Sequence, residues 1–344
     1  MLFSTPTPSK PLRADLAELD RLRDQLGALV GTPSPWLGGL RRQARVSTAE
    51  SSISIEGYTQ PSTDPEDQLA LECYARAMDH VGAMATDPEF AWSAQAIKSL
   101  HFDACWFQPD KSPGLFRTGP ISVTSPDGGD PAYVGPDDDA VVDLMAETVA
   151  WIADGDRDAH VAIRAAMAHL HVVSVHPFRD GNGRISRIVQ SLVLARDGVL
   201  APEFASIEEY LGRHTADYYA VLQRVQGGSY QPDRDAAPWV RFCIAAHLDQ
   251  ARARLVQVEQ ASRRWAVLEQ LVEGRGWPDR LVIALEQSLF GGVDRASYID
   301  EAGISAPTAS NDLRRLLDAG LVEQRGQSRN TRYVAADRLR AQIS

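Results

Sequence analysis

The sequence predicts a mainly α-helical protein that carries a β-hairpin in its body and a separate module at its C-terminal end. Leucines recur at helical spacing through residues 12–30, which indicates an amphipathic helix. Before residue 250 only residues 114–136 read as strand, and they contain a turn-rich tip. After residue 278 two short helical patterns around a glycine precede a second pair of strands.

The expected helices follow one another along the first half of the chain. Prolines and glycines at 33–39 break the first helical pattern, and Gly57 marks the end of the next helix, because glycine commonly follows the last helical residue. A turn rich in Pro, Ser and Asp at 61–65 precedes four more helices. These are expected at about 66–82, 90–107, 137–154 and 157–174, with the hairpin between the second and the third.

The C-terminal third predicts a different arrangement. A long helix is expected at about 237–272, after which Gly303 predicts a tight turn between two short helices, the second at about 306–318. Strands at 321–325 and 331–334 then form a hairpin. This order resembles the winged helix-turn-helix, a family of DNA-binding modules.

The charge of this module leaves its partner open. Residues 305–344 carry seven Arg or Lys and four Asp or Glu, a local charge of +3 in an acidic chain. Positive charge suits phosphate contacts and makes DNA binding through residues 295–335 an alternative. A protein-docking or homo-oligomer module is the favoured interpretation, because a fold does not fix a function.

Composition bounds the class of protein. The chain has 344 residues, 44% of them hydrophobic and 24% charged, which is typical of globular proteins. Its net charge of −11 argues against bulk binding to nucleic acid. Three widely separated cysteines predict neither a disulfide framework nor a zinc finger, so a reducing cytoplasm is the expected setting. Neither a secretory signal nor an apolar run long enough for a membrane span is found, so no membrane association is expected.

Residues 176–187 contain the parts of a phosphate site. Glycines on either side of one polar residue, in Gly181-Asn182-Gly183, let backbone N–H groups converge on one point. The helix expected at 184–194 starts here, and a helix N-terminus attracts anions. Arg184 and Arg187, three residues apart, project from nearly the same face and suit bidentate phosphate binding.

The same stretch offers a metal ligand and a base. Asp180 precedes the glycines and suits Mg²⁺, which prefers carboxylate, water and substrate oxygens. His176 precedes Pro177, which favours a loop, and a loop histidine beside a phosphate site is a candidate general base. A metal cluster of His169, His171 and His176 is the alternative, ranked lower because these histidines lead into the glycine turn.

At these residues the chain resembles the Fic family. That family's motif is His-Pro-Phe-x-Asp/Glu-Gly-Asn-Gly-Arg-x-x-Arg, and residues 176–187 match every specified position. The resemblance implies transfer of AMP from ATP to a protein hydroxyl. It implies the following roles: His176 as base, Asp180 as Mg²⁺ ligand, Gly181, Asn182 and Gly183 as anion hole, and Arg184 and Arg187 as ligands of the phosphates that leave as pyrophosphate.

The resemblance extends to two other segments. Residues 114–136 look like the family's flap, a hairpin that docks the protein substrate by strand addition, and the cluster at 126–131 fits its tip. An ordinary surface hairpin is the alternative. Tyr218 and Tyr219 resemble a pair that lines the adenine pocket, although paired aromatics are more often core.

A further match lies upstream. Residues 52–57, from Ser52 through Glu56 to Gly57, fit the family's inhibitory Ser/Thr-x-x-x-Glu-Gly/Asn motif, on a helix expected at about 47–57. Glu56 would lie at a helix C-terminus, where its charge opposes the helix dipole. The resemblance assigns it an arginine partner, here Arg187. An exposed glutamate on a solvated face is the alternative.

Together these observations predict an autoinhibited, Mg²⁺-dependent protein adenylyltransferase. It would modify Ser, Thr or Tyr hydroxyls of target proteins and of itself. Two alternatives are a nucleotide-sensing transcription regulator and a Fic enzyme that also removes AMP. The expected parts are an N-terminal helical region at 1–90, a catalytic core at 91–250, a connecting helix at 251–277 and the winged module at 278–344.

Overall fold

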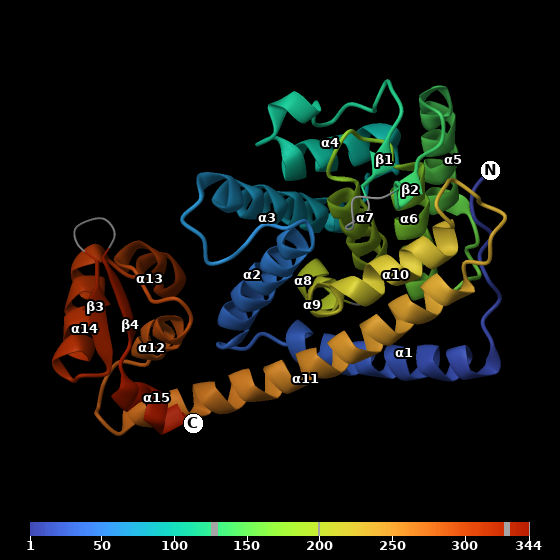
Figure 1. The fold of residues 1–344 in the computed structure, drawn as a ribbon. Helices are drawn as coiled ribbons and strands as arrows, with labels where there is room; N and C mark the ends of the chain where they lie inside the picture. The colour runs from blue at the N-terminus through green and yellow to red at the C-terminus, as the bar shows by residue number, and fades with distance from the viewer. Residues whose placement is uncertain (125–129, 199, 327–330, 344) are drawn as a thin grey trace. The chain divides into compact units, whose positions relative to one another are not determined.

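The computed structural model describes residues 1–124, 130–198, 200–326 and 331–343. Within these ranges the protein is mainly helical, which confirms the predicted fold class (Figure 1). The helices up to residue 273 are α1 (Lys10–Gly31), α2 (Leu37–Ile55), α3 (Pro65–Thr86), α4 (Ala94–Cys105), α5 (Val141–Asp154), α6 (Val161–Val175), α7 (Asn182–Arg196), α8 (Pro202–Ala205), α9 (Glu208–Arg213), α10 (Thr215–Gln226) and α11 (Ala237–Glu273), with 3-10 turns at Pro109–Lys111 and Asp138–Ala140. The remaining elements are β1 (Ser122–Val123), β2 (Tyr133–Val134), α12 (Leu281–Leu289), α13 (Arg295–Ala302), α14 (Ala306–Asp318), β3 (Val322–Arg325), β4 (Arg332–Ala335) and α15 (Asp337–Ile343).

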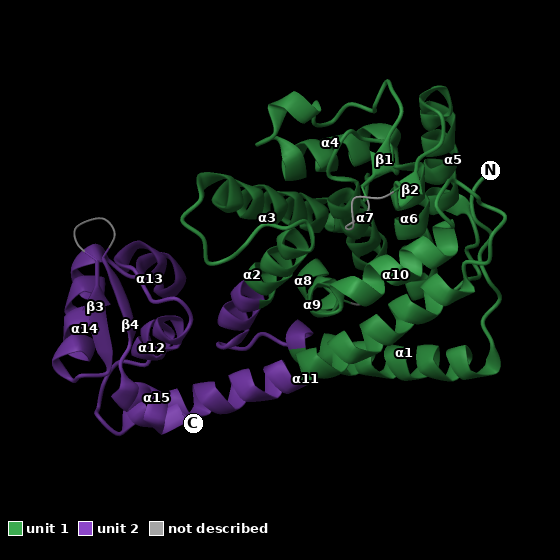
Figure 2. Ribbon diagram, viewed as in Figure 1, with its two compact units in different colours: residues 1–29, 44–255 green, residues 30–43, 256–344 purple. Residues whose placement is uncertain are grey.

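The chain divides into two compact units (Figure 2). Unit 1 comprises residues 1–29 and 44–255, and unit 2 comprises residues 30–43 and 256–344. The expected N-terminal region and catalytic core thus group into one unit. Residues 30–43 instead join the C-terminal region, where Trp36 packs against the apolar core.

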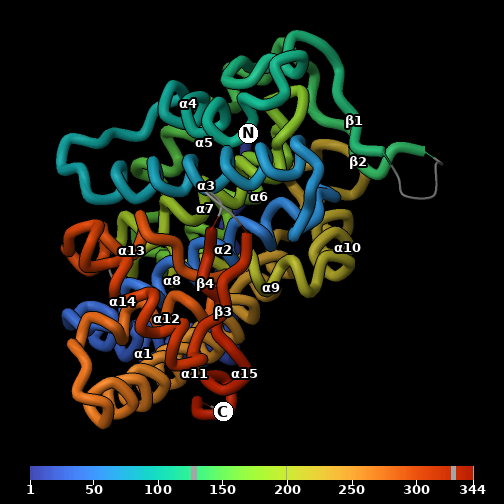
Figure 3. Tube along the Cα trace, turned by 90° about the vertical axis from the view of Figure 1, so that its left-hand side faces the viewer, coloured from blue at the N-terminus to red at the C-terminus, as the bar shows by residue number. Residues whose placement is uncertain are grey.

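The centre of unit 1 is the helix pair α6 and α7. Nearly every side chain of α6 is buried, as expected of a helix that is apolar all round. Helix α3 packs against both α4 and α7, and it runs beside α7 in Figures 1 and 3. Trp239 of α11 donates from Nε1 to the carbonyl of Ala166 at 2.7 Å, which ties α11 to α6. This core supports the loop between α6 and α7.

The start of α2 differs from the sequence prediction. The helix begins at Leu37, about ten residues earlier than expected. The break after α1 falls at residues 32–36, so the expectation that Gly38 and Gly39 interrupt the helical pattern was wrong. Gly39 allows close packing instead, because a Cβ there would lie 2.2 Å from the Oε2 atom of Glu286.

Unit 2 follows the expected order of helix, turn, helix and hairpin. Gly303 adopts a φ of 61° after α13, and the Ser305 side chain caps α14 by accepting from the N–H of Thr308. Strands β3 and β4 pair antiparallel, with Val322 opposite Ala335. The hairpin tip at 327–330 lies outside the described residues. Its assignment as a winged helix-turn-helix stays a prediction.

The helices found in the described ranges include none long and apolar enough to cross a membrane.

Four buried histidines make the stability of the protein sensitive to acid. Burial lowers the pKa of His101 to about 4 and that of His169, His171 and His247 to about 3. These values lie below about 6.5, the value in an unfolded chain, so the unfolded state binds more protons in this window. Above about pH 6.5 the four histidines are neutral in both states, so their protonation does not reduce the free energy of unfolding. As the pH falls from there toward the folded-state pKa values, the unfolded state takes up protons and the free energy of unfolding decreases.

We expect the melting temperature to fall as the pH is lowered from about 7 to about 4, at a cost of about 1.4 kcal/mol per pH unit for each histidine. Calorimetry at several pH values measures it. His171→Phe is the matched variant, because this ring packs edge-on against Trp151 and neither ring nitrogen has a hydrogen-bond partner among the described residues. That variant should lose less stability in acid. A melting temperature that stays constant over this window would contradict the expectation.

Candidate functional site

The site is built on the loop that joins α6 to α7. Helix α6 ends at Val175, and His176 turns the chain with a φ of 50°, in the left-handed region that non-glycine residues seldom adopt. The N–H of His176 still donates to the carbonyl of Val172 at 3.0 Å. Helix α7 then begins at Asn182, after Gly181 with a φ of 73°. The expected loop position of His176 is therefore observed.

The glycine turn is held rigid from inside. The Oδ1 atom of Asn182 accepts from the N–H of Phe178 at 2.9 Å, and its Nδ2 atom donates to the Phe178 carbonyl at 2.8 Å. A Cβ on Gly181 would lie 2.4 Å from the Sγ atom of Cys105, so no larger residue fits there. Since the first N–H groups of a helix have no intrahelical partner, the turn and the start of α7 can bind an anion.

The geometry around His176 fixes which ring nitrogen acts as a base. The Nδ1 atom lies 3.1 Å from the carbonyl of Val173. A carbonyl oxygen only accepts, so Nδ1 carries the proton and Nε2 keeps its lone pair. Burial, aided by the nearby Arg117 guanidinium, lowers the pKa of His176 below its ordinary value despite the hydrogen bond to Val173. The ring is therefore neutral and able to accept a proton at neutral pH.

Asp180 lies beside the turn with one oxygen partly accessible. Its Oδ1 atom accepts from the N–H of Gly181 at 2.7 Å, and its Oδ2 atom lies 3.5 Å from Nη2 of Arg184. The Asp180 side chain is 39% exposed. Arg184 is buried, and its Nη2 atom also donates to the Gln108 side chain at 3.1 Å. The carboxylate and the guanidinium thus lie close together at the mouth of the turn.

Arg187 joins the motif to the end of α2. Its Nη2 atom lies 2.8 Å from Oε1 of Glu56 and donates to the Ser52 carbonyl at 3.0 Å, while its Nε atom donates to Oγ of Ser52 at 2.8 Å. Burial opposes the charge, but attraction to Glu56 raises the pKa of Arg187 above its ordinary value. All three residues belong to unit 1. Glu56 is only 19% exposed, which does not fit a glutamate on a solvated face.

The carboxylate of Glu56 lies over the first turn of α7. A Cβ on Gly183 would be 2.5 Å from Oε1 of Glu56 and 3.2 Å from Nη1 of Arg187. That Nη1 atom is buried and has no hydrogen-bond partner in the described part of the chain. An unpaired buried donor beside N–H groups suits an anion, because leaving it unpaired is costly.

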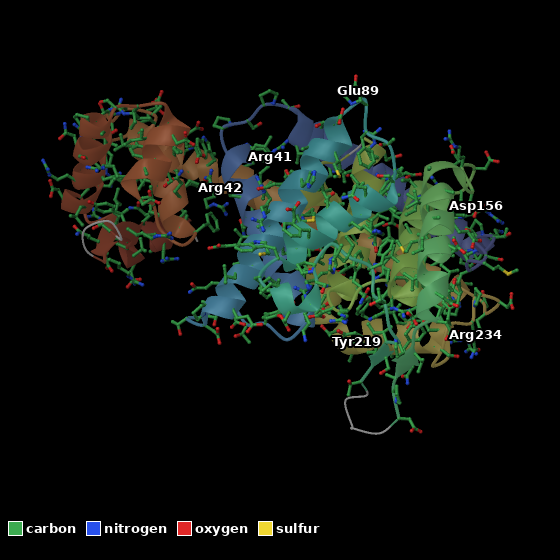
Figure 4. The ribbon with its side chains drawn as sticks, turned by 90° about the horizontal axis from the view of Figure 1, so that it is seen from above. Arg41, Arg42, Glu89, Asp156, Tyr219 and Arg234 are labelled. Carbon is green, nitrogen blue, oxygen red and sulfur yellow. The ribbon has the colours of Figure 1, made fainter. Side chains whose placement is uncertain are left out.

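The two tyrosines of α10 have different surroundings. Tyr218 is buried, and its hydroxyl lies 3.1 Å from Nε2 of His169. Tyr219 is 47% exposed, and its hydroxyl donates to the Ile55 carbonyl at 3.1 Å. Figure 4 labels Tyr219 among the side chains drawn as sticks. The adenine-pocket role of this pair stays a prediction, and only Tyr219 presents an accessible ring.

The alternative histidine metal cluster is not assembled. His169 bonds to Gln190 at 2.7 Å, and His171 packs against Trp151 with no polar partner among the described residues. Among the described residues, no group of three or more His, Cys, Asp or Glu side chains could hold a metal ion.

The expected hairpin forms beside the loop. Strand β1 pairs antiparallel with β2, with Ser122 opposite Val134, and Val134 also bridges to Ser229 on its other side. Strand β1 therefore presents the outer edge of this small sheet in the described part of the chain. Tyr133 of β2 donates from its hydroxyl to the carbonyl of Ser174. The predicted tip at 126–131 lies mostly outside the described residues, since 125–129 are not described.

Sequence reasoning missed two buried residues of this site. His101 of α4 accepts from the N–H of Gly114 at Nδ1 and donates from Nε2 to the Asp180 carbonyl, both at 2.9 Å. Arg117 donates from Nε to the carbonyl of His176 at 2.9 Å. For His101 the available signal was a polar residue on the apolar face of a helix.

A family comparison places this site in context. Residues 91–194 match the model of the Fic/DOC family. This range holds α4, the hairpin, α5, α6 and all but the last two residues of α7, and so it contains every residue of the loop described above.

Similar proteins carry names consistent with this match. The protein adenylyltransferase fic-1 of Caenorhabditis briggsae is 34% identical over 123 residues, which are 36% of this chain and 22% of that protein. The protein adenylyltransferase Fic of Drosophila mojavensis is 27% identical over 256 residues, which are 68% of this chain and 46% of that protein. The chain therefore spans less than half the length of these relatives.

Solved structures share the fold. A Fic family protein from Desulfovibrio desulfuricans G20 has a TM-score of 0.59 at 21% identity, covering 97% of this chain and 98% of that one. Fic-1 from Caenorhabditis elegans has a TM-score of 0.59 at 22% identity, covering 72% and 73%. At these identities the likeness shows the fold alone.

Proposed function

We propose that this chain, whose residues 91–194 match the Fic/DOC family model, is a protein adenylyltransferase that transfers AMP from ATP to Ser, Thr or Tyr hydroxyls of target proteins and of itself. The observation that carries the proposal is the loop 176–187. It combines a neutral histidine whose Nε2 atom is unprotonated with a glycine turn and an unpaired arginine donor. These groups suit a hydroxyl nucleophile on one side and a polyphosphate on the other.

His176 would act on the attacking group. Its Nε2 atom would accept the hydroxyl proton as the hydroxyl oxygen bonds to the α-phosphorus. The bond between the α-phosphorus and the oxygen that bridges it to the β-phosphorus breaks, and pyrophosphate leaves. The N–H groups at Gly181 to Gly183 would bind phosphate oxygens, that of Gly181 in place of its bond to Oδ1 of Asp180. Arg184 and Arg187 hold the leaving phosphates, as their burial beside the turn supports.

The residues present fit a bound Mg²⁺ ion. Asp180 offers a partly exposed carboxylate beside the turn, and Mg²⁺ commonly takes one or two carboxylates together with substrate phosphates and water. We therefore assign Asp180 as its protein ligand. When bound there, the ion would neutralise charge on the phosphates.

The pair between Glu56 and Arg187 supports an autoinhibited ground state. The Nε and Nη2 atoms of Arg187 are bound to Ser52 and Glu56, so these two donors are not free to hold a phosphate and only Nη1 is left unpaired among the described residues. The Glu56 carboxylate also lies over Gly183, where it would repel an anion bound to the turn.

The protein substrate would dock on the edge of β1. Backbone hydrogen bonds of an added strand give register without requiring a particular sequence. The C-terminal module in unit 2 would contribute a second docking or self-association surface, with DNA binding through 295–335 as the less favoured role.

Two other functions are less well supported. A nucleotide-sensing transcription regulator has no need for a base with a fixed tautomer, which His176 provides. Removal of AMP is a second reaction that the same site would have to perform in addition to transfer.

A labelling experiment tests the proposed function. We expect the 344-residue chain, incubated with Mg²⁺ and ATP labelled on the α-phosphate, to label itself and proteins of a cell lysate. Mass spectrometry should locate AMP on Ser, Thr or Tyr, with pyrophosphate released. ATP labelled on the γ-phosphate is the control and should leave no label on protein. Protein labelled only from γ-labelled ATP would indicate phosphoryl transfer and contradict the proposal.

A further inference from the structure

Arg117 occupies an unusual environment for a buried arginine. Arg117 is only 5% exposed, yet within the described residues its guanidinium donates to backbone carbonyls rather than to a carboxylate. Burial lowers its pKa, which records the cost of holding this charge in the interior. A buried guanidinium with such partners indicates that the residue fixes the positions of backbone segments, since its planar group binds several acceptors at once.

The acceptors come from three different places. The Nε atom donates to the carbonyl of His176 at 2.9 Å, Nη1 donates to that of Gly119 at 2.8 Å, and Nη2 donates to that of Pro136 at 2.6 Å. Gly119 precedes β1 and Pro136 follows β2, so one side chain bonds to both ends of the hairpin and to the histidine. The N–H of Arg117 also donates to the carbonyl of Pro177 at 2.9 Å.

The backbone of His176 needs such support. A non-glycine residue in the left-handed region costs on the order of 1–3 kcal/mol and persists only where its surroundings fix it. His176, with a φ of 50°, is fixed by its N–H to Val172, by Nδ1 to Val173 and, at its carbonyl, by Arg117. Of these three supports, only Arg117 comes from outside α6.

The hairpin approaches closely at the same point. A Cβ on Gly135 would lie 2.8 Å from Cγ2 of Ile121, 3.3 Å from Nη2 of Arg117 and 3.6 Å from Cβ of His176. Glycine at this position therefore allows the end of β2 to pack onto the arginine and the histidine together.

We propose that Arg117 is a positioning residue that couples the hairpin to the base. It holds the carbonyl of His176 and both ends of the docking strands, so a target strand added to β1 is placed in fixed register with Nε2 of His176. The proposal rests on the proposed AMP transfer only for its effect on rate.

The test compares Arg117→Lys with the parent and with Arg196→Lys, all in the 344-residue chain carrying Glu56→Gly so that transfer is measurable. Lysine keeps the charge but has no planar fork for three carbonyls. Arg196, at the end of α7, also donates to three backbone carbonyls and lies outside the loop 176–187, so Arg196→Lys is the matched control. Misplacement of a reacting group by about 1 Å costs on the order of 10²-fold. We expect Arg117→Lys to lower kcat for self-labelling by about 10- to 100-fold while the Kd for ATP changes less than about twofold.

Two readouts do not depend on catalysis. Amide hydrogen exchange at 119–123 and 132–136 should quicken in Arg117→Lys and not in Arg196→Lys. The pKa of the His176 ring, measured by NMR titration, should change in Arg117→Lys because the ring is no longer held in its present surroundings. Gly135→Ala is a second route to the same effect, since its Cβ presses on Ile121 and Arg117 without altering the guanidinium.

The outcomes separate this proposal from the proposed function. Unchanged exchange and unchanged His176 titration in both Arg117→Lys and Gly135→Ala would overturn the positioning role, whatever the rate. Altered exchange and titration in a chain that transfers no AMP would support the coupling and reject the adenylyltransferase. Should Arg117→Lys fail to fold, Gly135→Ala decides by the same two readouts.

Discussion

Replacing His176 with alanine is expected to lower AMP transfer by about 10²–10⁴-fold and to leave ATP binding nearly unchanged. The Nε2 atom is the acceptor for the hydroxyl proton, and loss of a general base typically has a cost of this size. The glycine turn, Arg184 and Arg187 stay in place to bind the nucleotide. Self-labelling with α-labelled ATP and a separate nucleotide-binding titration measure the two effects.

The unusual backbone of His176 calls for a control. Alanine at a φ of 50° is strained and could shift the whole loop, whereas asparagine adopts the left-handed region more readily. His176→Asn therefore removes the base and keeps the turn. If His176→Asn transfers AMP at the wild-type rate, His176 is not the base. If only His176→Ala loses ATP binding, that loss comes from the backbone.

Helices with strong local signals were predictable from the sequence. Helix α14 was expected at 306–318 and observed at Ala306–Asp318, because Ser305 supplies a side-chain cap and Pro307 suits a first turn. The long helix expected at 237–272 is α11. Helix α2 was placed too short, because Gly38 and Gly39 looked like local breakers, whereas both lie within the helix and Gly39 allows Glu286 to pack closely.

The site was predictable where it is continuous in the chain. Residues 176–187 carry the base, the carboxylate and the glycine turn in one stretch, so their spacing alone indicated a phosphate site. Arg117 is 59 residues from His176, and His101 is 79 residues from Asp180. No periodicity links residues so far apart. Their hydrogen bonds go to backbone carbonyls, which every residue has, so the partner residues cannot be identified from the sequence.

The partner of Glu56 is a different case. Glu56 and Arg187 are 131 residues apart, and the family resemblance, rather than any pattern of the residues, suggested that they meet. The described geometry brings them to 2.8 Å. The inhibitory role that the resemblance attaches to this contact stays a prediction, because a contact alone does not show what it prevents.

Glu56→Gly is expected to raise self-labelling, by on the order of 10²-fold where the bound ATP is misaligned in the parent chain. Removing the carboxylate frees Arg187 for a phosphate and clears the space over Gly183, since Oε1 now lies 2.5 Å from where a Cβ would be. The rate of incorporation from α-labelled ATP with Mg²⁺ measures the effect. Equal labelling of parent and variant would contradict autoinhibition by this residue.

Two companion variants identify how Glu56 acts. Arg187→Ala also breaks the pair, but it removes a phosphate ligand and should not activate. Both variants release the end of α2 from Arg187, so activation by Glu56→Gly alone would show that a looser α2 is not the cause. Glu56→Gln keeps the volume and removes the charge. If it activates as strongly as glycine, the carboxylate inhibits through its charge and its grip on Arg187. If it stays inactive, the side chain inhibits by occupying the space over Gly183, since an amide oxygen still accepts a hydrogen bond from Arg187.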